Sequence, residues 1–231
     1  MGTFGASIDP RSLARYIDHT LLKPEAGAAA IERLCDEALR FGFRTVCVNG
    51  RWVPLCAKLL SGTSVGVSAV VGFPLGAGMS EVKAYEAETA VRAGASEIDM
   101  VLPVGALLDG DKAGVLADIR QVVDAVKGKA IVKVILETGL LNDGQKRTAC
   151  RLAEQAGAHF VKTSTGFGSG GATVEDVRLL RESVSPAIGV KASGGIRDFK
   201  TALAMIEAGA TRIGTSSGVA IVSGASGAAS Y

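Results

Sequence analysis

Three lysines lie inside apolar stretches of the chain, where an ammonium group is unusual. Lys133, Lys162 and Lys191 follow one another at intervals of 29 residues, and each comes directly after a valine. Burying an ammonium is costly unless the charge is compensated. Two such groups roughly 6 Å apart, at an effective dielectric near 20, repel strongly enough to lower one lysine pKa by about two units. A neutral amine is a nucleophile that condenses with a carbonyl to form a Schiff base.

Two carboxylates occur in the same kind of stretch, Asp99 in EIDMV and Glu137 in KVILET. One interpretation pairs the lysines with these carboxylates as inert buried ion pairs. The pattern of three lysines in consecutive apolar segments favours a reactive cluster instead. A protonated imine is an electron sink for C–C bond cleavage, and Asp99 would then carry the protons that the reaction moves. Spacing alone leaves open which lysine attacks.

Glycine-rich segments follow the last apolar stretches and predict an anion site. Residues 193–197 read SGGIR, residues 214–218 read GTSSG, and residues 165–168 read TGFG. Glycine lets backbone N–H groups approach an anion closely, and a following helix start adds partial positive charge. One such loop alone is an ordinary turn. Adjacent loops beside a lysine cluster predict a phosphate site. Cys47 is expected near its mouth, either as a core thiol or as one made reactive by the cations.

A repeated sequence pattern predicts the helices and strands that carry these residues. Ala-Gly-Ala ends an amphipathic segment at 93–95, 156–158 and 208–210, and an apolar run follows each time. Such a glycine stops a helix, and a continuous apolar run suits a strand of a buried parallel sheet. The expected strands are 16–20, 45–49, 65–73, 97–103, 130–138, 160–164, 188–193 and 211–215. The expected helices are 26–41, 52–60, 81–93, 112–127, 142–156, 173–183 and 198–208, and residues 214–218 open a short eighth one. Ser80, Asn142 and Thr173 are the expected N-caps, and Gln145 completes a capping box with Asn142.

Eight strand–helix units predict a single-domain (β/α)8 TIM barrel of the α/β class over residues 1–231, with its active site at the carboxyl ends of the strands. An open doubly wound sheet is the alternative, but no GxGxxG motif follows the first strand. Residues 1–14 are expected to form a leading cap. Residues 223–231 are expected to form a mobile tail that ends at Tyr231, whose hydroxyl either is disordered or folds back to shuttle a proton.

Composition limits the classes of partner. Lys plus Arg number 25 and Asp plus Glu 23, a net charge of +2, so no broad field for nucleic acid or a membrane surface is expected. Four cysteines without a CxxC motif and two histidines favour neither a disulfide scaffold nor a metal site. The uncharged run 59–80 is broken by Gly, Ser and Pro and is expected to be a strand and a loop. We expect no metal or cofactor. We expect the protein to be located in the reducing cytoplasm.

Several stretches together resemble the deoxyribose-phosphate aldolase family, the class I, Schiff-base-forming aldolases. They cover about residues 16–218 in the family's order and are DHTLLKP (18–24), VCVN (46–49), VVGFPLG (70–76), EIDMV (97–101), KVILET (133–138), FVKTSTGF (160–167), VKASGGIR (190–197) and RIGTSSG (212–218). The resemblance implies reversible, metal-free cleavage of 2-deoxy-D-ribose 5-phosphate to D-glyceraldehyde 3-phosphate and acetaldehyde, in the catabolism of deoxyribose phosphate.

The same resemblance implies a role for each matching residue. Lys162 would form the Schiff base, Lys191 would lower its pKa and exchange protons, and Asp99 would transfer protons with the help of water. Six residues would bind the phosphate, namely Gly166, Gly194, Gly195, Arg197, Ser216 and Ser217. Three would support the site, namely Lys133, Cys47 and Thr165. The expected partners are a small sugar phosphate, acetaldehyde and further copies of the chain in a homodimer or higher homo-oligomer.

Two other functions remain open on the residues. A different Schiff-base sugar-phosphate aldolase or a transaldolase would use the same lysine with a ketone donor. A non-catalytic barrel that binds a sugar phosphate would keep the glycine loops and form no imine, because fold does not dictate function.

Overall fold

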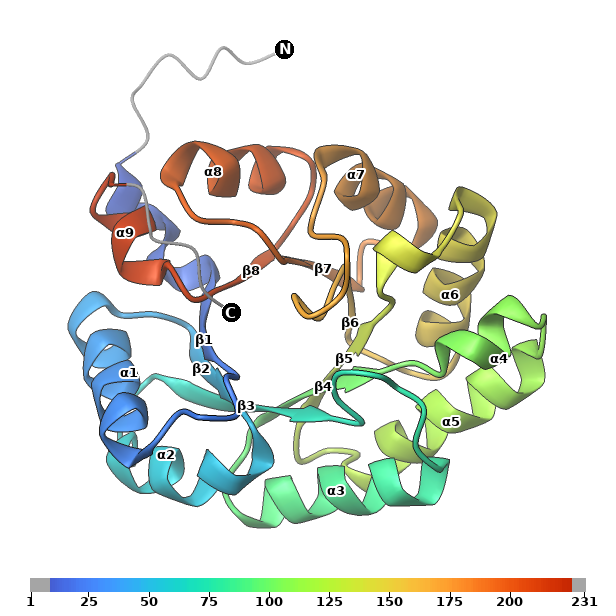
Figure 1. Cartoon of the computed structure of the whole chain (residues 1–231), viewed down its shortest axis with the longest axis horizontal. Coiled ribbons are helices and arrows are strands. Elements are labelled where there is room, and N and C mark those ends of the chain that lie inside the picture. Colours follow the sequence, from blue (N-terminus) through green and yellow to red (C-terminus); the bar gives the residue numbers. More distant parts are fainter. Residues whose placement is uncertain (1–8, 226–231) are drawn as a thin grey trace.

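Eight parallel strands close into a barrel, and helices surround it (Figure 1). The computed structural model describes residues 9–225. Neighbouring strands follow chain order, and β1 closes the barrel by pairing with β8. The predicted (β/α)8 barrel is confirmed, and the doubly wound sheet is wrong. The strands are β1 Ile17–Leu21, β2 Thr45–Val48, β3 Gly66–Val71, β4 Glu97–Val101, β5 Ile131–Ile135, β6 Phe160–Lys162, β7 Gly189–Ser193 and β8 Arg212–Thr215.

The helices occupy the predicted segments, with small differences at their ends. They are α1 Ala28–Phe41, α2 Val53–Leu59, α3 Ser80–Arg92, α4 Val104–Leu108, α5 Lys112–Ala125, α6 Asp143–Gln155, α7 Val174–Ser183, α8 Phe199–Glu207 and α9 Gly218–Val222, with short 3-10 helices η1 Pro10–Tyr16, η2 Gly50–Trp52 and η3 Thr138–Leu140. The sequence analysis missed α4, because its five residues are too few to display a helical period.

Helix ends follow the expected local chemistry at most positions. Asn142 caps α6 in a capping box with Gln145, and Thr173 caps α7. Gly94, Gly157 and Gly209 of the three Ala-Gly-Ala segments all have positive φ, between 88° and 113°. The expected cap at Ser80 is wrong. Met79 precedes α3, and the Ser80 hydroxyl instead donates a 2.7 Å hydrogen bond to Asp118 on α5.

Several strands are shorter than the apolar runs that predicted them. β5 ends at Ile135 and β6 at Lys162, although the expected strands continue to 138 and 164. Apolar character persists beyond the ladder because the loops at this end are themselves buried. Glu137 therefore lies outside the strand, in the left-handed region with φ 56° and ψ 63°, at the start of η3.

The barrel separates two kinds of interior. Apolar side chains such as Val46, Ile98 and Val134 face the helices and form the main core. Polar side chains occupy the alternate strand positions, and their hydrogen bonds connect β3, β4, β5, β6 and β7 across the barrel. This alternation follows from the two-residue period of a strand. The space enclosed by the sheet is therefore a charged compartment inside an apolar wall.

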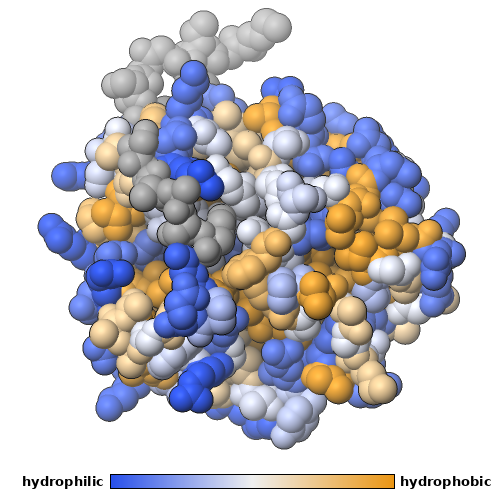
Figure 2. All heavy atoms as spheres, viewed as in Figure 1, coloured by the Kyte–Doolittle hydropathy of each residue, from blue (hydrophilic) through white to orange (hydrophobic). Residues whose placement is uncertain are grey.

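The loops after β3, β5 and β6 expose apolar side chains on either side of a small recess of about 140 Å³. Leu75 is 75 % exposed, Leu140 is 53 % and Phe167 is 42 %. Figure 2 shows apolar side chains at the centre of this view and to its right. The rim of the barrel near these loops is thus apolar, in contrast to the polar interior of the barrel.

The first and last described helices meet on one side of the barrel, where η1 packs against α9. The expected leading cap is described from residue 9 and is largely η1. Residues 223–225 of the expected tail continue from α9, and the Ala225 amide donates to Ala220 O at 2.9 Å. Tyr231 lies outside the described residues. Within residues 9–225, no helix has the length and apolar character that a membrane span requires.

Candidate active site

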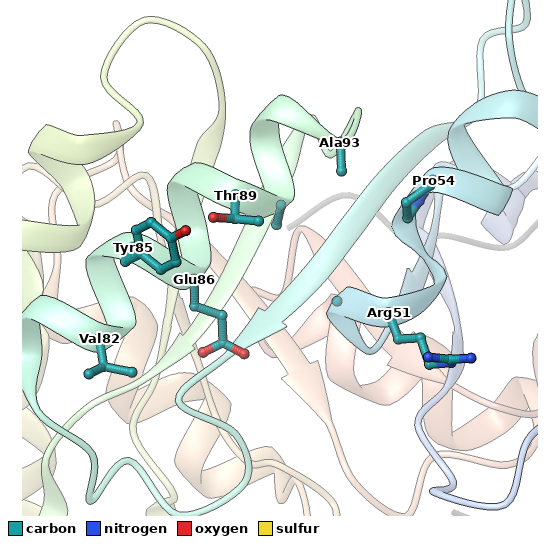
Figure 3. Close-up of a pocket in the computed structure, with 9 residues that line it drawn as sticks. Arg51, Pro54, Val82, Tyr85, Glu86, Thr89 and Ala93 are labelled. Atoms are coloured by element: carbon teal, nitrogen blue, oxygen red, sulfur yellow. The ribbon is translucent and has the colours of Figure 1, made fainter.

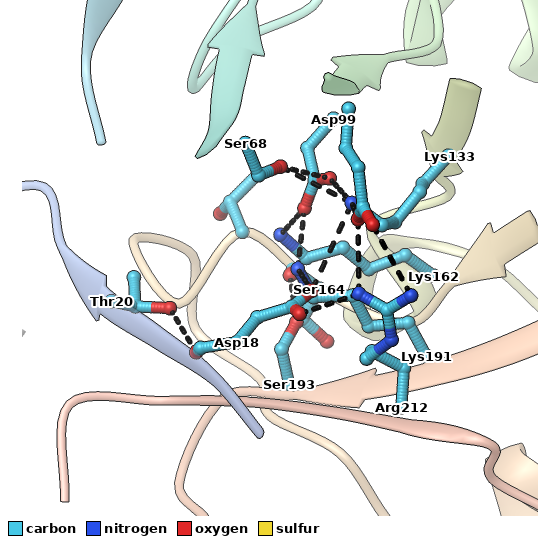
Figure 4. Close-up of polar contacts among 12 residues, drawn as sticks. Asp18, Thr20, Ser68, Asp99, Lys133, Lys162, Ser164, Lys191, Ser193 and Arg212 are labelled. Carbon is cyan, nitrogen blue, oxygen red and sulfur yellow. Dashed lines mark hydrogen bonds and ion pairs between the residues drawn. The ribbon is translucent and has the colours of Figure 1, made fainter. Parts of the chain in front are cut away.

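Asp99 on β4 lies at the centre of the barrel and contacts all three lysines (Figure 4). Its Oδ1 accepts from Lys133 Nζ at 2.7 Å and from the Ser68 hydroxyl at 3.0 Å. Its Oδ2 accepts from Lys162 Nζ at 2.9 Å and from Lys191 Nζ at 2.7 Å. The three predicted lysines therefore converge on one fully buried carboxylate.

The other partners of the lysines are unequal. Lys133 Nζ also lies 2.6 Å from Glu97 and 3.8 Å from Asp18, and Lys191 Nζ lies 2.6 Å from Asp18. Lys162 has Asp99 as its carboxylate partner in the described structure, and it shares that carboxylate with the other two lysines. Lys162 is thus the least compensated of the three ammonium groups.

The pKa values likewise distinguish Lys162 from the other two lysines. Burial has the largest effect on each and lowers its pKa. At Lys133 and Lys191, the neighbouring carboxylates more than offset burial, so the pKa is raised. At Lys162, Asp99 opposes burial but Lys191 adds to it, so the pKa is lowered. Of the three lysines, Lys162 is therefore the one biased toward a neutral amine.

The pKa of Lys162 is lowered, as expected, but the main cause differs from the expected one. The sequence analysis attributed the lowered pKa of Lys162 chiefly to repulsion between lysines. In the structure, removal from water contributes more than Lys191 does. The expected pairing of the lysines with Asp99 is observed. The expected pairing with Glu137 is wrong, because Glu137 makes no ion pair in the described structure, whereas Asp18 pairs with Lys133 and Lys191 and Glu97 pairs with Lys133.

Three charged residues of this compartment were missed from the sequence: Asp18, Glu97 and Arg212. The Arg212 Nη1 atom lies 2.6 Å from Asp18 and 2.9 Å from Glu97, and all three residues are buried. A signal was present, because Glu97 stands two positions before Asp99 and therefore shares its face of β4. The sequence search weighted the ends of strands and overlooked their beginnings.

Gly214 on β8 provides the space that Lys191 requires. A Cβ atom at this position would lie 2.9 Å from Lys191 Cε and 2.9 Å from Ser193 Cβ. Any larger residue would therefore push the Lys191 side chain away from Asp18 and Asp99.

The predicted phosphate residues lie on the loops after β6, β7 and β8. Gly166, Gly194 and Gly195 have φ values of 85°, 96° and 78°, which favour glycine. The loops after β6 and β7 are joined, because the Ala172 amide donates to Gly194 O at 3.0 Å. After β8, Ser217 is buried and Ser216 is half-buried, while Arg197 is exposed beside the β7 loop.

Glu137 and Thr165 tie the loop after β5 to the loop after β6. The buried Glu137 carboxylate accepts hydrogen bonds from the Thr165 hydroxyl and from its backbone amide. The Thr165 hydroxyl in turn accepts from the Phe167 amide at 3.0 Å. The sequence analysis placed Thr165 in a supporting role, and its observed contacts brace the loop that contains Gly166.

Cys47 on β2 belongs to a small apolar cluster with Leu22, Val70 and Phe73. Burial raises the pKa of the Cys47 thiol, although the nearby lysines oppose that effect. Its burial in this cluster and the raised pKa favour the core thiol over the reactive thiolate. Among residues 9–225, no group of three or more His, Cys, Asp or Glu side chains could hold a metal ion.

Comparison with known proteins identifies the family of the chain. Residues 12–224 match the model of the DeoC/LacD family aldolases. The chain belongs to this aldolase family. A deoxyribose-phosphate aldolase of Bacillus licheniformis is 60 % identical over 93 % of this chain and 96 % of its own length. One from Enterococcus faecalis is 59 % identical over 93 % and 98 %.

A solved relative has the same fold. The tetrameric deoxyribose phosphate aldolase of Aeropyrum pernix superposes with a TM-score of 0.86 at 38 % identity, over 93 % of this chain and 91 % of that one. Members of the family thus match this chain over nearly its whole length.

Gly214→Ala is expected to destabilise the protein by about 1–3 kcal/mol, because overpacking a filled interior forces neighbouring side chains to move. It should also weaken any activity that needs Lys191 in place. Gly78→Ala is the control, since no atom beyond its immediate chain neighbours lies within 4 Å of its added Cβ. Urea unfolding and turnover of both variants test this, and a Gly214→Ala protein as stable and active as the wild type would contradict it.

Proposed function

We propose that this chain catalyses the reversible cleavage of 2-deoxy-D-ribose 5-phosphate to D-glyceraldehyde 3-phosphate and acetaldehyde, with Lys162 as the Schiff-base residue. The observation that carries the assignment is the unequal distribution of carboxylates, which leaves Lys162 with Asp99 alone and lowers its pKa, while the pKa values of Lys133 and Lys191 are raised. The high identity to aldolases named for this substrate supports the choice of reaction. The enzyme is then an aldehyde-lyase.

The proposed reaction begins at the open-chain aldehyde. The neutral Lys162 amine attacks C1, and loss of water from the carbinolamine gives a protonated imine. A base removes the proton of the C3 hydroxyl, the C2–C3 bond breaks, and its electron pair flows into the imine. Glyceraldehyde 3-phosphate leaves, and the remaining enamine takes a proton at C2. Water then hydrolyses the imine, which releases acetaldehyde and restores the amine.

Asp99 and Lys191 have different roles in this reaction. Asp99 lies within hydrogen-bonding distance of the Lys162 amine, so its carboxylate, together with water, is suited to move protons at C1 and C2. Neighbouring carboxylates raise the pKa of Lys191 despite its burial, which suits a fixed cation next to Lys162 better than a proton donor at neutral pH. Lys133 holds Asp99 from the opposite oxygen.

The phosphate is proposed to bind where the loops after β6, β7 and β8 meet. The backbone amides of Gly166, Gly194 and Gly195 and the hydroxyls of Ser216 and Ser217 would surround it, and Arg197 would supply charge from solvent. The positive φ values of the glycines support this, since they are typical of loops that let a backbone approach an anion.

We further propose that the protein acts in deoxyribose phosphate catabolism in the cytoplasm. The four free cysteines support the cytoplasmic location.

We also propose that the chain forms a homo-oligomer through α3. Met79, Val82 and Tyr85 recur along one side of its first turns and are 74 %, 57 % and 65 % exposed. Val82 and Tyr85 border a groove of about 740 Å³ between α3 and the η2–α2 segment, with Glu86 on one side and Arg51 on the other (Figure 3). A second copy in two-fold arrangement would cover the apolar residues and bring opposite charges together. The tetrameric relative from Aeropyrum pernix supports self-association.

Tyr85→Asp is expected to dissociate the oligomer, because a charge would be buried against the partner copy. Leu39→Asp on α1 is the control, since Leu39 is also exposed but lies on another helix. Sedimentation velocity measures both. A monomeric wild type, or an oligomer unaffected by Tyr85→Asp, would overturn the proposal.

The Schiff base is tested by trapping. The wild type is incubated with acetaldehyde and reduced with borohydride, and the modified peptide is expected to contain Lys162. Lys162→Ala should lose the adduct and turnover. Lys191→Leu should require a higher pH for the adduct, because loss of a neighbouring cation raises the pKa of Lys162.

An adduct with a ketose phosphate instead of acetaldehyde would favour a transaldolase-like enzyme, and no adduct with either would favour a binding protein.

Arg197→Ala is expected to raise KM for the phosphorylated substrate about tenfold and to leave kcat nearly unchanged, as expected for loss of one charge-assisted hydrogen bond. Unphosphorylated deoxyribose should be turned over by the variant as by the wild type. Steady-state kinetics with both sugars measure the difference, and an equal loss with both would contradict the assignment.

A further inference from the structure

The ion pairs around Asp99 form one connected network that extends well below Lys162. Within the described residues, the network contains three carboxylates and four basic side chains (Figure 4). The carboxylates are Asp18, Glu97 and Asp99. The basic residues are Lys133, Lys162, Lys191 and Arg212. All seven are buried, so water does little to screen them.

With every member ionised, the network would hold one uncompensated positive charge in an enclosed space. Burying such a charge is strongly unfavourable, and a titratable group responds by becoming neutral. Asp18 and Asp99 stay ionised, because lysines and, at Asp18, Arg212 hold their pKa values below the ordinary range despite burial. Lys133, Lys191 and Arg212 have raised pKa values. Lys162 is therefore the member that can release the excess proton.

Arg212 and Glu97 lie at the start of their strands, away from the loops proposed to bind substrate. Arg212 is the first residue of β8 and Glu97 the first of β4. Arg212 makes ion pairs with Asp18 and Glu97, and in the described structure neither Arg212 nor Glu97 forms a hydrogen bond or ion pair with Lys162. Their effect on Lys162 would be electrostatic, exerted through the net charge of the buried network.

We propose that Arg212 and Glu97 are positioning residues that set the protonation state of Lys162 through the charge balance of this network, without touching the substrate. The inference rests on the proposed function in that it concerns the Schiff-base residue. The charged and titratable groups that face Lys162 or join its network come from six strands: Asp18 on β1, Cys47 on β2, Glu97 and Asp99 on β4, Lys133 on β5, Lys191 on β7 and Arg212 on β8.

Charge balance predicts effects of opposite sign. Arg212→Met removes a positive charge, so Lys162 should be protonated up to a higher pH. Glu97→Gln removes a negative charge, so Lys162 should lose its proton at a lower pH. Each shift should be about one pH unit, the size expected for a unit charge roughly 10 Å away at an effective dielectric near 20. The double variant Glu97→Gln/Arg212→Met restores the balance and should return near the wild-type value.

The readout is the pH dependence of Lys162 acetylation by trace acetic anhydride in the folded protein, quantified by peptide mass spectrometry. This reaction reports the free amine and needs no turnover. Asp118→Asn is the matched control, because Asp118 is a buried carboxylate paired with Lys83 outside the barrel interior. It should leave the Lys162 titration unchanged. Thermal unfolding of each variant identifies any that does not fold, and Glu97→Gln, which keeps the side-chain shape, tests the sign by itself.

Opposite shifts that cancel in the double variant support the inference. Shifts of the same sign, or no shift in either single variant, overturn it. Borohydride trapping with acetaldehyde is run in parallel on the wild type. Absence of a Lys162 adduct there overturns the proposed function, whereas the acetylation titration still decides whether the network sets the charge of Lys162.

Discussion

One carboxylate shared by three amines organises the interior of this barrel. Asp99 compensates Lys133 and Lys191 only together with Asp18 and Glu97, and Lys162 is left with a share of Asp99 alone. A buried ammonium with so little compensation loses its proton more readily than an ordinary lysine. The unequal distribution of carboxylates, more than the presence of three lysines, makes one amine different from its neighbours.

The barrel makes this distribution possible because the register of its adjacent parallel strands fixes which charged residues become neighbours. Lys162 pairs in register with Lys191, and Lys191 with Arg212. Asp99 pairs with Lys133 across the β4–β5 ladder. The sheet wall around them is apolar on its outer face, and it keeps water from relieving the imbalance. Fold and electrostatics are therefore inseparable at this site.

The sequence predicted the barrel and its polar interior well because both follow from short-range periodicity. Ala-Gly-Ala stops and valine-flanked lysines are local signals. It did not predict that Asp18, Glu97 and Arg212 complete the network, since their pairing spans residues 18 to 212 and depends on barrel closure. It also assigned Glu137 to a strand, because an apolar run gives no sign of where a ladder ends or a backbone turns left-handed.

The bond between Glu137 and Thr165 has a consequence for the evolution of the barrel rim. Loops at the top of such barrels are commonly regarded as independent modules that can be exchanged or lengthened one at a time. Here the carboxylate after β5 fixes the hydroxyl and amide of the segment after β6. Grafting either loop from a distant homologue would break that brace, so the two are expected to be inherited, and to be redesigned, as one unit.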